Sequence, residues 1–138
     1  MRTRIFLDTV FIVALVNEDD DLHEQALKLS AQYEGHPLVV TDAVLLEVGN
    51  ALARNHKQAA VEIISGLLAS DDVEIIHLTP KLFQQAFALY GTYHDKAWGL
   101  VDCISFTVMR ESRITTALTF DRHFEQAGFQ VLMLNNRK

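Results

Sequence analysis

Residues 4–16 read Arg-Ile-Phe-Leu-Asp-Thr-Val-Phe-Ile-Val-Ala-Leu-Val, and this stretch decides the fold. Its apolar start, residues 4–7, predicts a short buried strand that ends at Asp8, and the apolar residues 9–16 that follow directly predict a helix. Asp8 stands at the junction, where an aspartate serves either as a turn or N-cap residue or as a functional acid. Both interpretations of Asp8 stay open at this point.

The same alternation of strand and helix continues along the chain. Further strands are predicted at residues 38–40, 73–76, 115–118 and 130–133. Further helices are predicted at residues 20–33, from an N-cap at Thr41 or Asp42 to about residue 54, and at 58–69, 80–90 and 100–110. This order favours an α/β fold in which a mainly parallel sheet carries helices on both faces and binds ligands at the carboxyl ends of its strands. No linker or repeat interrupts the pattern, so residues 1–138 are expected to form one domain.

The composition is that of a folded, water-soluble domain, with 49% hydrophobic and 22% charged residues. The longest apolar run, residues 10–16, is far shorter than the ~20 residues that a membrane-spanning helix needs. Asp8 interrupts the apolar start and no cleavage site of small residues follows, so a secretory signal is not expected. Cys103 is the single cysteine, which excludes an internal disulfide. We therefore expect a cytoplasmic protein that does not contact a membrane.

The charge balance limits how this chain could bind nucleic acid. It has 12 Lys and Arg residues against 18 Asp and Glu residues, a net charge of −6. A protein that holds nucleic acid through a general basic surface usually has the opposite excess. Two alternatives follow. Either the partner is not a nucleic acid, or carboxylates gather at a cation that links them to an anionic substrate.

Four acids favour the second alternative when they are taken together. Asp8 directly follows one predicted strand and Asp121 lies just past the end of another, whereas Glu47 and Asp102 lie on apolar helices that should pack against the sheet. Each has an ordinary structural interpretation as a turn, an N-cap or a polar helix position. At one edge of a parallel sheet, however, the four could not all ionise without cations between them. Ligand sets made only of oxygen suit Mg²⁺ or Mn²⁺, which can activate water against a phosphodiester.

Four segments of the chain resemble the PIN-domain family, which includes the VapC-type toxins of bacterial toxin–antitoxin pairs. They are Phe-Leu-Asp-Thr at 6–9, Leu-Glu-Val at 46–48, Leu-Val-Asp-Cys at 100–103, and Leu-Thr-Phe-Asp-Arg-His-Phe at 118–124 followed by Ala-Gly-Phe at 127–129. The last segment is the most specific, and all four occur in the order and near the spacing of the family.

This resemblance implies a three-layer α/β/α sandwich and an endoribonuclease that depends on Mg²⁺ or Mn²⁺. It implies catalytic and metal-binding roles for Asp8, Glu47, Asp102 and Asp121, of which Asp8 and Asp102 would be the main ligands. Thr9 and Thr119 would support these acids or the bound water. An RNA substrate, an antitoxin partner and a homodimer are implied as well. The alternatives are an RNA-processing enzyme outside any toxin system and a PIN scaffold that only binds a partner.

Two other families begin with an aspartate after the first strand but fit less well. A phosphatase of the haloacid-dehalogenase type needs a second aspartate two residues further on, and Val10 occupies that position. A receiver-like signalling domain needs an acidic pair before its phospho-acceptor and a lysine after a late strand, and this sequence has neither.

Several residues near these segments are interpreted as structural. We expect His123 to be a surface residue, Cys103 a packed thiol, and Asp19-Asp20-Asp21 the start of a helix. Residues 93–96, Tyr-His-Asp-Lys, are interpreted as a solvated loop, with contact between Asp95 or Lys96 and the substrate as the alternative. The basic residues best placed to meet an RNA backbone are Arg110, Arg113, Arg122, Arg137 and Lys138.

Overall fold

A five-stranded, entirely parallel sheet forms the centre of the protein, as the sequence predicts. The computed structural model describes residues 3–132. Within them the strands are β1 (Ile5–Leu7), β2 (Leu38–Thr41), β3 (Val73–Ile76), β4 (Thr116–Leu118) and β5 (Gln130–Val131). Their order across the sheet is β3-β2-β1-β4-β5. The central position of β1 follows from its register, because Phe6 pairs with Val39 of β2 on one side and with Ala117 of β4 on the other.

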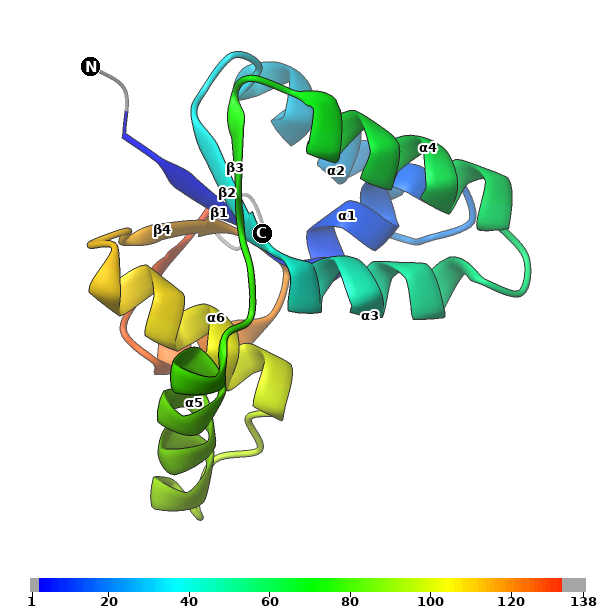
Figure 1. Cartoon of the computed structure of the whole chain (residues 1–138). Coiled ribbons are helices and arrows are strands. Elements are labelled where there is room, and N and C mark those ends of the chain that lie inside the picture. Colours follow the sequence, from blue (N-terminus) through cyan, green and yellow to red (C-terminus); the bar gives the residue numbers. More distant parts are fainter. Residues whose placement is uncertain (1–2, 133–138) are drawn as a thin grey trace.

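Helices cover the two faces of this sheet and complete the expected three layers (Figure 1). They are α1 (Thr9–Val16), α2 (His23–Gln32), α3 (Asp42–Leu52), α4 (Lys57–Ala69), α5 (Pro80–Thr92), α6 (Leu100–Glu111) and α7 (Arg122–Gln126). Helices α1 to α4 contact one another on one side of the strands, and α5 to α7 lie on the other side. Helix α3 also contacts α6, so the two groups of helices meet at one edge of the sheet.

The strand order fixes where a ligand site can form. From β1 the chain moves outward through β2 to β3, then returns to the other side of β1 as β4. Beyond the carboxyl ends of β1 and β4 the connections therefore leave in opposite directions, which opens a crevice in parallel sheets of this kind. Asp8 follows β1 directly, and Asp121 lies three residues after β4. Two of the four acids are thus carried to this crevice by the topology alone.

An aromatic cluster in the core holds α6 and α7 against the central strand. The side chains of Phe6, Phe106 and Phe124 are fully buried. The ring of Phe106 meets that of Phe124 edge-on, with centroids 4.9 Å apart and an interplanar angle of 86°, and the Phe6 and Phe124 centroids are 6.1 Å apart. Edge-to-face contact is a preferred geometry for aromatic pairs. The cluster therefore fixes the helix that carries Asp102 relative to the strand that carries Asp8.

The predicted boundaries differ from the observed ones mainly at α2. This helix begins at His23 and not at residue 20, because polar side chains close turns before it. Oδ1 of Asn17 accepts a hydrogen bond from the backbone of Asp19, and Oδ1 of Asp20 accepts one from the backbone of Leu22. The acidic run is a pair of turns and not the first turn of the helix.

The other boundaries agree to within a few residues. Thr41, and not Asp42, caps α3, since its Oγ1 accepts a hydrogen bond of 3.0 Å from the backbone of Val44. Pro80 opens α5 as predicted. The predicted last strand is observed at 130–131, and its residue Met133 lies outside the described residues, as do Arg137 and Lys138. No helix between residues 3 and 132 is both long enough and apolar enough to cross a membrane.

The end of α6 offers a test of the backbone geometry. Arg113 has a φ of 57°, and the amides of Arg113 and Ile114 donate to the carbonyls of Arg110 and Met109. This is the left-handed helix ending that favours glycine. Arg113→Gly should raise the free energy of unfolding by about 0.5–1 kcal/mol, because glycine avoids the clash of a Cβ atom at positive φ. Chemical denaturation measures the change. Arg113→Ala is the control, and an equal gain in that variant would contradict the explanation.

Candidate active site

The four acids predicted from the sequence line one open cleft at the crevice beyond β1 and β4. The cleft has a volume of about 610 Å³. Its lining consists of Asp8, Thr9, Val10, Glu47, Asn50, Ala51, Asp102 and Asp121. The acids come from four different elements: the end of β1, helix α3, helix α6 and the segment after β4. The fold thus brings together carboxylates that are up to 113 positions apart in the sequence, from Asp8 to Asp121.

Asp8 is the most deeply buried of the four, with an exposed fraction of 3%. Burial raises the pKa of its carboxyl from 3.8 to about 7. A side-chain hydrogen bond from Thr119 and a backbone hydrogen bond from Thr9 lower the pKa, whereas the negative charges of Asp102 and Asp121 raise it further. The positive charge of a cation beside Asp8 would lower this pKa and so oppose the effect of burial. Asp8 is therefore a group that gains from binding one.

Thr119 joins the ends of the two central strands at this site. Its Oγ1 donates a 2.7 Å hydrogen bond to Oδ2 of Asp8 and accepts a 2.9 Å hydrogen bond from the backbone of Asp121. The Thr119 side chain is fully buried, so water does not compete for either bond. One hydroxyl group thereby sets the position of Asp8 and of the backbone that leads to Asp121.

Thr9 plays a similar part for Glu47. Its Oγ1 lies 2.6 Å from Oε1 of Glu47 and donates a hydrogen bond to it, which links the first turn of α1 to the middle of α3. Asn50, one turn after Glu47 on α3, also lines the cleft. Glu47 and Asn50, one turn apart on this largely apolar helix, thus both face the cleft.

A histidine that sequence analysis set aside belongs to the site. We predicted that His123 would be a surface residue, and this was wrong: its Nδ1 lies 2.9 Å from Oδ2 of Asp102 and 3.3 Å from Oδ1 of Asp121. Asp121 caps the short helix α7 by accepting a hydrogen bond from the backbone of His123, and this turn carries the imidazole back over the acids. The signal for this position in the sequence is the spacing Asp-x-His shortly after a strand.

Asp102 is held by two donors. Its Oδ2 accepts a 3.1 Å hydrogen bond from the backbone of Gly99 as well as the contact with His123. Burial raises the pKa of Asp102, the hydrogen bonds from His123 and Gly99 lower it, and the charge of Asp121 raises it. Its neighbour Cys103 is a packed thiol as predicted, and burial raises the pKa of that thiol to about 11.

The donor set fits a divalent cation. Ligand atoms of Asp102, Asp121 and His123 lie within 4.8 Å of one another, and among residues 3–132 they form the group that meets this spacing. Asp8 and Glu47 line the same cleft but lie outside this group. Carboxylate oxygens dominate the set, which is typical of sites for hard cations. These residues could hold a divalent metal ion.

Comparison with known proteins shows to which family the chain belongs. The sequence model of the PIN domain matches residues 5–130, which include all four acids. The chain belongs to the PIN-domain family. It is 35% identical, over 126 residues, to the "23S rRNA-specific endonuclease VapC20" of Mycobacterium tuberculosis, and the match covers 91% of this chain and 95% of that protein.

Solved structures agree with this assignment to the PIN-domain family. The crystal structure of Mycobacterium tuberculosis VapC20, described as a sarcin–ricin loop cleaving toxin, has a TM-score of 0.83 at 33% identity and covers 91% of this chain and 95% of its own. VapBC2 from Rickettsia felis, bound to a promoter DNA fragment, has a TM-score of 0.64 at 17% identity, with 94% and 96% covered. A toxin–antitoxin complex from Klebsiella pneumoniae has a TM-score of 0.57 at 16% identity, with 86% and 87% covered. The last two show the fold alone.

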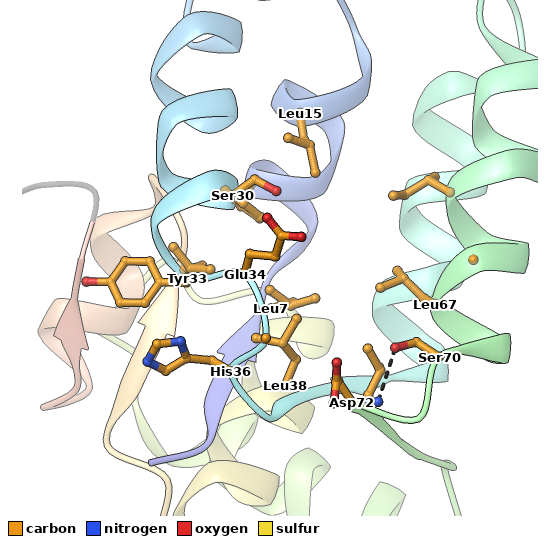
Figure 2. Close-up of a pocket in the computed structure, with 16 residues that line it drawn as sticks. Leu7, Leu15, Ser30, Tyr33, Glu34, His36, Leu38, Leu67, Ser70 and Asp72 are labelled. Carbon is orange, nitrogen blue, oxygen red and sulfur yellow. Dashed lines mark hydrogen bonds between the residues drawn. The ribbon is translucent and has the colours of Figure 1, made fainter. Parts of the chain in front are cut away.

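This PIN domain also has an apolar cavity that is separate from the acids. Figure 2 shows it between α2 and α4, over the sheet, where Leu7, Leu38 and Leu67 point into the hollow. Its volume is about 310 Å³, and it shares no lining residue with the acid cleft. Glu34 and Asp72 lie at its margin. The cavity lacks the group of carboxylates that lines the cleft. It is better suited to binding apolar side chains than to catalysis.

The buried Asp8 gives a stability prediction. Its pKa is raised on folding, so the folded protein loses stability as the pH rises from about 4 through about 7. In chelator at pH ~8, Asp8→Asn should therefore raise the free energy of unfolding by roughly 2–4 kcal/mol, because it removes a buried charge. The gain should shrink steadily toward pH ~4, where the Asp8 carboxyl of the folded wild type is protonated and no longer carries a buried charge.

Chemical denaturation of the two proteins across this pH range measures the effect. Asp71→Asn, which changes an exposed aspartate outside the cleft, is the matched control and should leave stability unchanged at every pH. A constant difference between Asp8→Asn and wild type at all pH values would show that packing, and not the charge of Asp8, causes it.

Proposed function

We propose that this PIN domain is a metal-dependent endoribonuclease that hydrolyses RNA phosphodiester bonds and acts as the toxin of a toxin–antitoxin pair. The observation that carries the proposal is the cleft in which Asp8, Glu47, Asp102 and Asp121 meet. The 35% identity to a protein described as a 23S rRNA-specific endonuclease supports the same reaction. Four intact acids at the cleft favour an enzyme over a scaffold that only binds a partner.

Each residue has a role in this proposal that its contacts support. Asp8 and Asp102 are the main metal ligands, and Glu47 and Asp121 complete the ligand set or orient the attacking water. Thr119 and Thr9 hold Asp8 and Glu47 through the hydrogen bonds described above. His123 holds Asp102 by donating from Nδ1. A bound divalent ion supplies Lewis acidity, which activates water and neutralises charge on the phosphate.

We assign Mg²⁺ or Mn²⁺ to the site on the chemistry of its donors. Oxygen ligands from carboxylates suit both ions, whereas zinc sites usually contain thiolate or several imidazole ligands. The single imidazole, His123, is already engaged with Asp102 and Asp121. The chain has a net charge of −6, which disfavours the approach of an anionic RNA backbone. A cation at the site supplies positive charge at the place where that backbone must bind.

The proposed substrate class rests on the relative with the highest TM-score among those described above, and the proposed partner on the toxin–antitoxin complexes that share the fold. A protein described as a sarcin–ricin loop cleaving toxin shares the fold and 33% of the residues. We propose structured ribosomal RNA as the substrate class, and an antitoxin that buries apolar side chains in the cavity of Figure 2. The homodimer and the cytoplasmic location stay predictions.

The direct test of the reaction is cleavage of an RNA fragment that contains the sarcin–ricin loop, with Mg²⁺ or Mn²⁺ and with chelator. Asp102→Asn should reduce the rate by ~100-fold or more, because an active-site metal supplies several kcal/mol of transition-state stabilisation. Asp71→Asn, an exposed aspartate outside the cleft, should cleave like wild type. Full activity in chelator, or in Asp102→Asn, would contradict the proposal. Absence of both cleavage and metal binding would favour the scaffold, whereas metal binding without cleavage would point to a narrower RNA substrate than the one tested.

The role of His123 has its own test. His123→Ala should weaken Mn²⁺ binding by about 10–100-fold, the usual effect of removing a group that orients a metal ligand. Titration calorimetry with Mn²⁺ measures the affinity. His77→Ala is the matched control, because His77 pairs with Asp42 at an exposed site away from the cleft. Unchanged Mn²⁺ affinity in His123→Ala would remove His123 from the proposed metal centre.

A further inference from the structure

A third hollow lies in the loop that connects α5 to α6, and neither the metal centre nor the apolar cavity uses it. Its volume is about 440 Å³, and its lining includes Tyr90, Tyr93, Lys96, Trp98 and Gly99. Ligand pockets in proteins commonly measure about 300–1,000 Å³. The hollow is thus large enough for a ligand of nucleotide size. Aromatic rings and a cationic group in one pocket are the features by which proteins hold single-stranded nucleic acid.

The aromatic pair in this hollow is built on a rigid support. Tyr93 and Trp98 have ring centroids 5.1 Å apart, and Tyr93 keeps an exposed fraction of 40%. Two contacts hold Trp98 in place. Its Nε1 donates a 3.0 Å hydrogen bond to Oε1 of Gln126, and its ring packs edge-on against Phe106 with the ring centroids 5.1 Å apart. The exposed ring of Tyr93 is thus backed by a side chain that is only 7% exposed. A fixed aromatic face loses little conformational entropy when a flat ligand stacks on it.

One hydrogen bond joins this hollow to the acid cleft. Gly99 lines the hollow, and its backbone amide donates to Oδ2 of Asp102, which lines the cleft. Residues 93–99 lead directly into α6, whose third residue is Asp102. An RNA strand with its scissile phosphate at the acids would therefore have a neighbouring nucleotide within reach of the loop.

Lys96 gives the hollow a cation in an otherwise acidic chain. Its Nζ lies 3.3 Å from Oδ2 of Asp95, and the exposed fractions of the two side chains are 33% and 73%. Ion pairs as exposed as this contribute only about 0–1 kcal/mol, so a phosphate group can replace Asp95 as the partner of Lys96 at little cost. Asp95 then lowers the affinity of the hollow for an anion without abolishing it.

The aromatic surface continues beyond the hollow along α5. Tyr90, Phe87 and Phe83 are all exposed, with centroid distances of 6.5 Å and 6.1 Å between successive rings and interplanar angles of 17° and 6°. Tyr90 lines the hollow itself. Large apolar side chains that gather on a surface usually mark a binding site. Here they extend the path from the acid cleft through Gly99 and Tyr93.

We propose that Tyr93, Trp98 and Lys96 form a nucleotide subsite, in which a base of the RNA next to the cleaved bond stacks on Tyr93 and its phosphate pairs with Lys96. The inference rests on the proposed ribonuclease function, since that function supplies the ligand class. Stacking of this kind tolerates any base. The subsite therefore raises the affinity for RNA and fixes the position of the strand relative to the acids, and it selects little for sequence.

Trp98 provides the readout, because it is the single tryptophan of the chain. Short oligoadenylate and oligouridylate are titrated into the full chain, with Mg²⁺ and separately with chelator, while the tryptophan emission and the anisotropy of labelled RNA are recorded. RNA should change the emission in a saturable manner, and Tyr93→Leu should weaken binding by about 10-fold or more. Val61→Ala, which changes an exposed apolar residue of α4 that lines neither the hollow, the cleft nor the apolar cavity, is the control and should bind like wild type.

Two further variants change the affinity in opposite directions, which a purely structural effect would not do. Asp95→Asn frees Lys96 and should tighten RNA binding, whereas Lys96→Gln should weaken it. Unfolding temperatures check that all the variants fold. Unchanged tryptophan emission with both oligomers in both conditions, or equal affinity of Tyr93→Leu and wild type, would overturn the subsite.

The remaining outcomes separate this inference from its rivals. If RNA binding shows the expected pattern but no metal supports cleavage, the subsite stands and the nuclease proposal fails. If Tyr93→Leu cleaves RNA with an unchanged KM, the nuclease stands and the subsite fails. If Tyr93→Leu and Phe87→Ser turn a dimer into a monomer in sedimentation while RNA affinity is unchanged, the face of α5 binds a second copy of the chain and the subsite is overturned.

Discussion

The burial of one carboxylate at the end of the central strand is the constraint on which the site depends. β1 has a strand on each side, so Asp8 is enclosed by the segments that follow β1 and β4 and has little access to water. A charge in such a place needs a partner, because solvation is lost on folding. The hydroxyl of Thr119 supplies part of the compensation, and the other acids add repulsion. The arrangement is unfavourable for the fold alone, and a cation beside Asp8 would compensate for the buried charge.

The remaining contacts hold the acids in place before any ligand arrives. Thr119 fixes Asp8, Thr9 fixes Glu47, and Asp102 is fixed by Gly99 and His123. Behind them the cluster of Phe6, Phe106 and Phe124 sets the distance between β1 and the helices that carry Asp102 and His123. Rigid apolar packing thus supports a polar site with little freedom to relax. Such preorganisation is a large part of how enzymes lower barriers electrostatically.

Most of this fold could be predicted from local patterns, and most of the site from the topology that they imply. The apolar runs before Asp8 and before Asp121 identified the two central strands, and the ends of parallel strands necessarily share an edge. The start of α2 was misplaced because side chains of Asn17 and Asp20 form turns that compete with the helix. The contacts of His123 were not predicted, because they depend on the tight turn of the chain after Asp121. The hydrophobic pattern of the sequence carries no information on such a turn. Cavities between elements, such as the one beside Tyr93, arise from three-dimensional packing and cannot be predicted from the sequence pattern.

One carboxylate oxygen of Asp102, Oδ2, lies at the cleft and also takes part in capping a helix. Its Oδ2 accepts the amide hydrogen of Gly99, so the same carboxylate that faces the cleft also caps the first turn of α6. An N-terminal cap is worth about 1 kcal/mol, and a cation that competes for this oxygen loosens it. Binding of an ion at Asp102 would therefore be thermodynamically linked to fraying of the first turn of α6. If Asp102 binds the ion as proposed, the loop before α6 would respond to ion occupancy, and RNA held by the loop would in turn change the affinity for the ion.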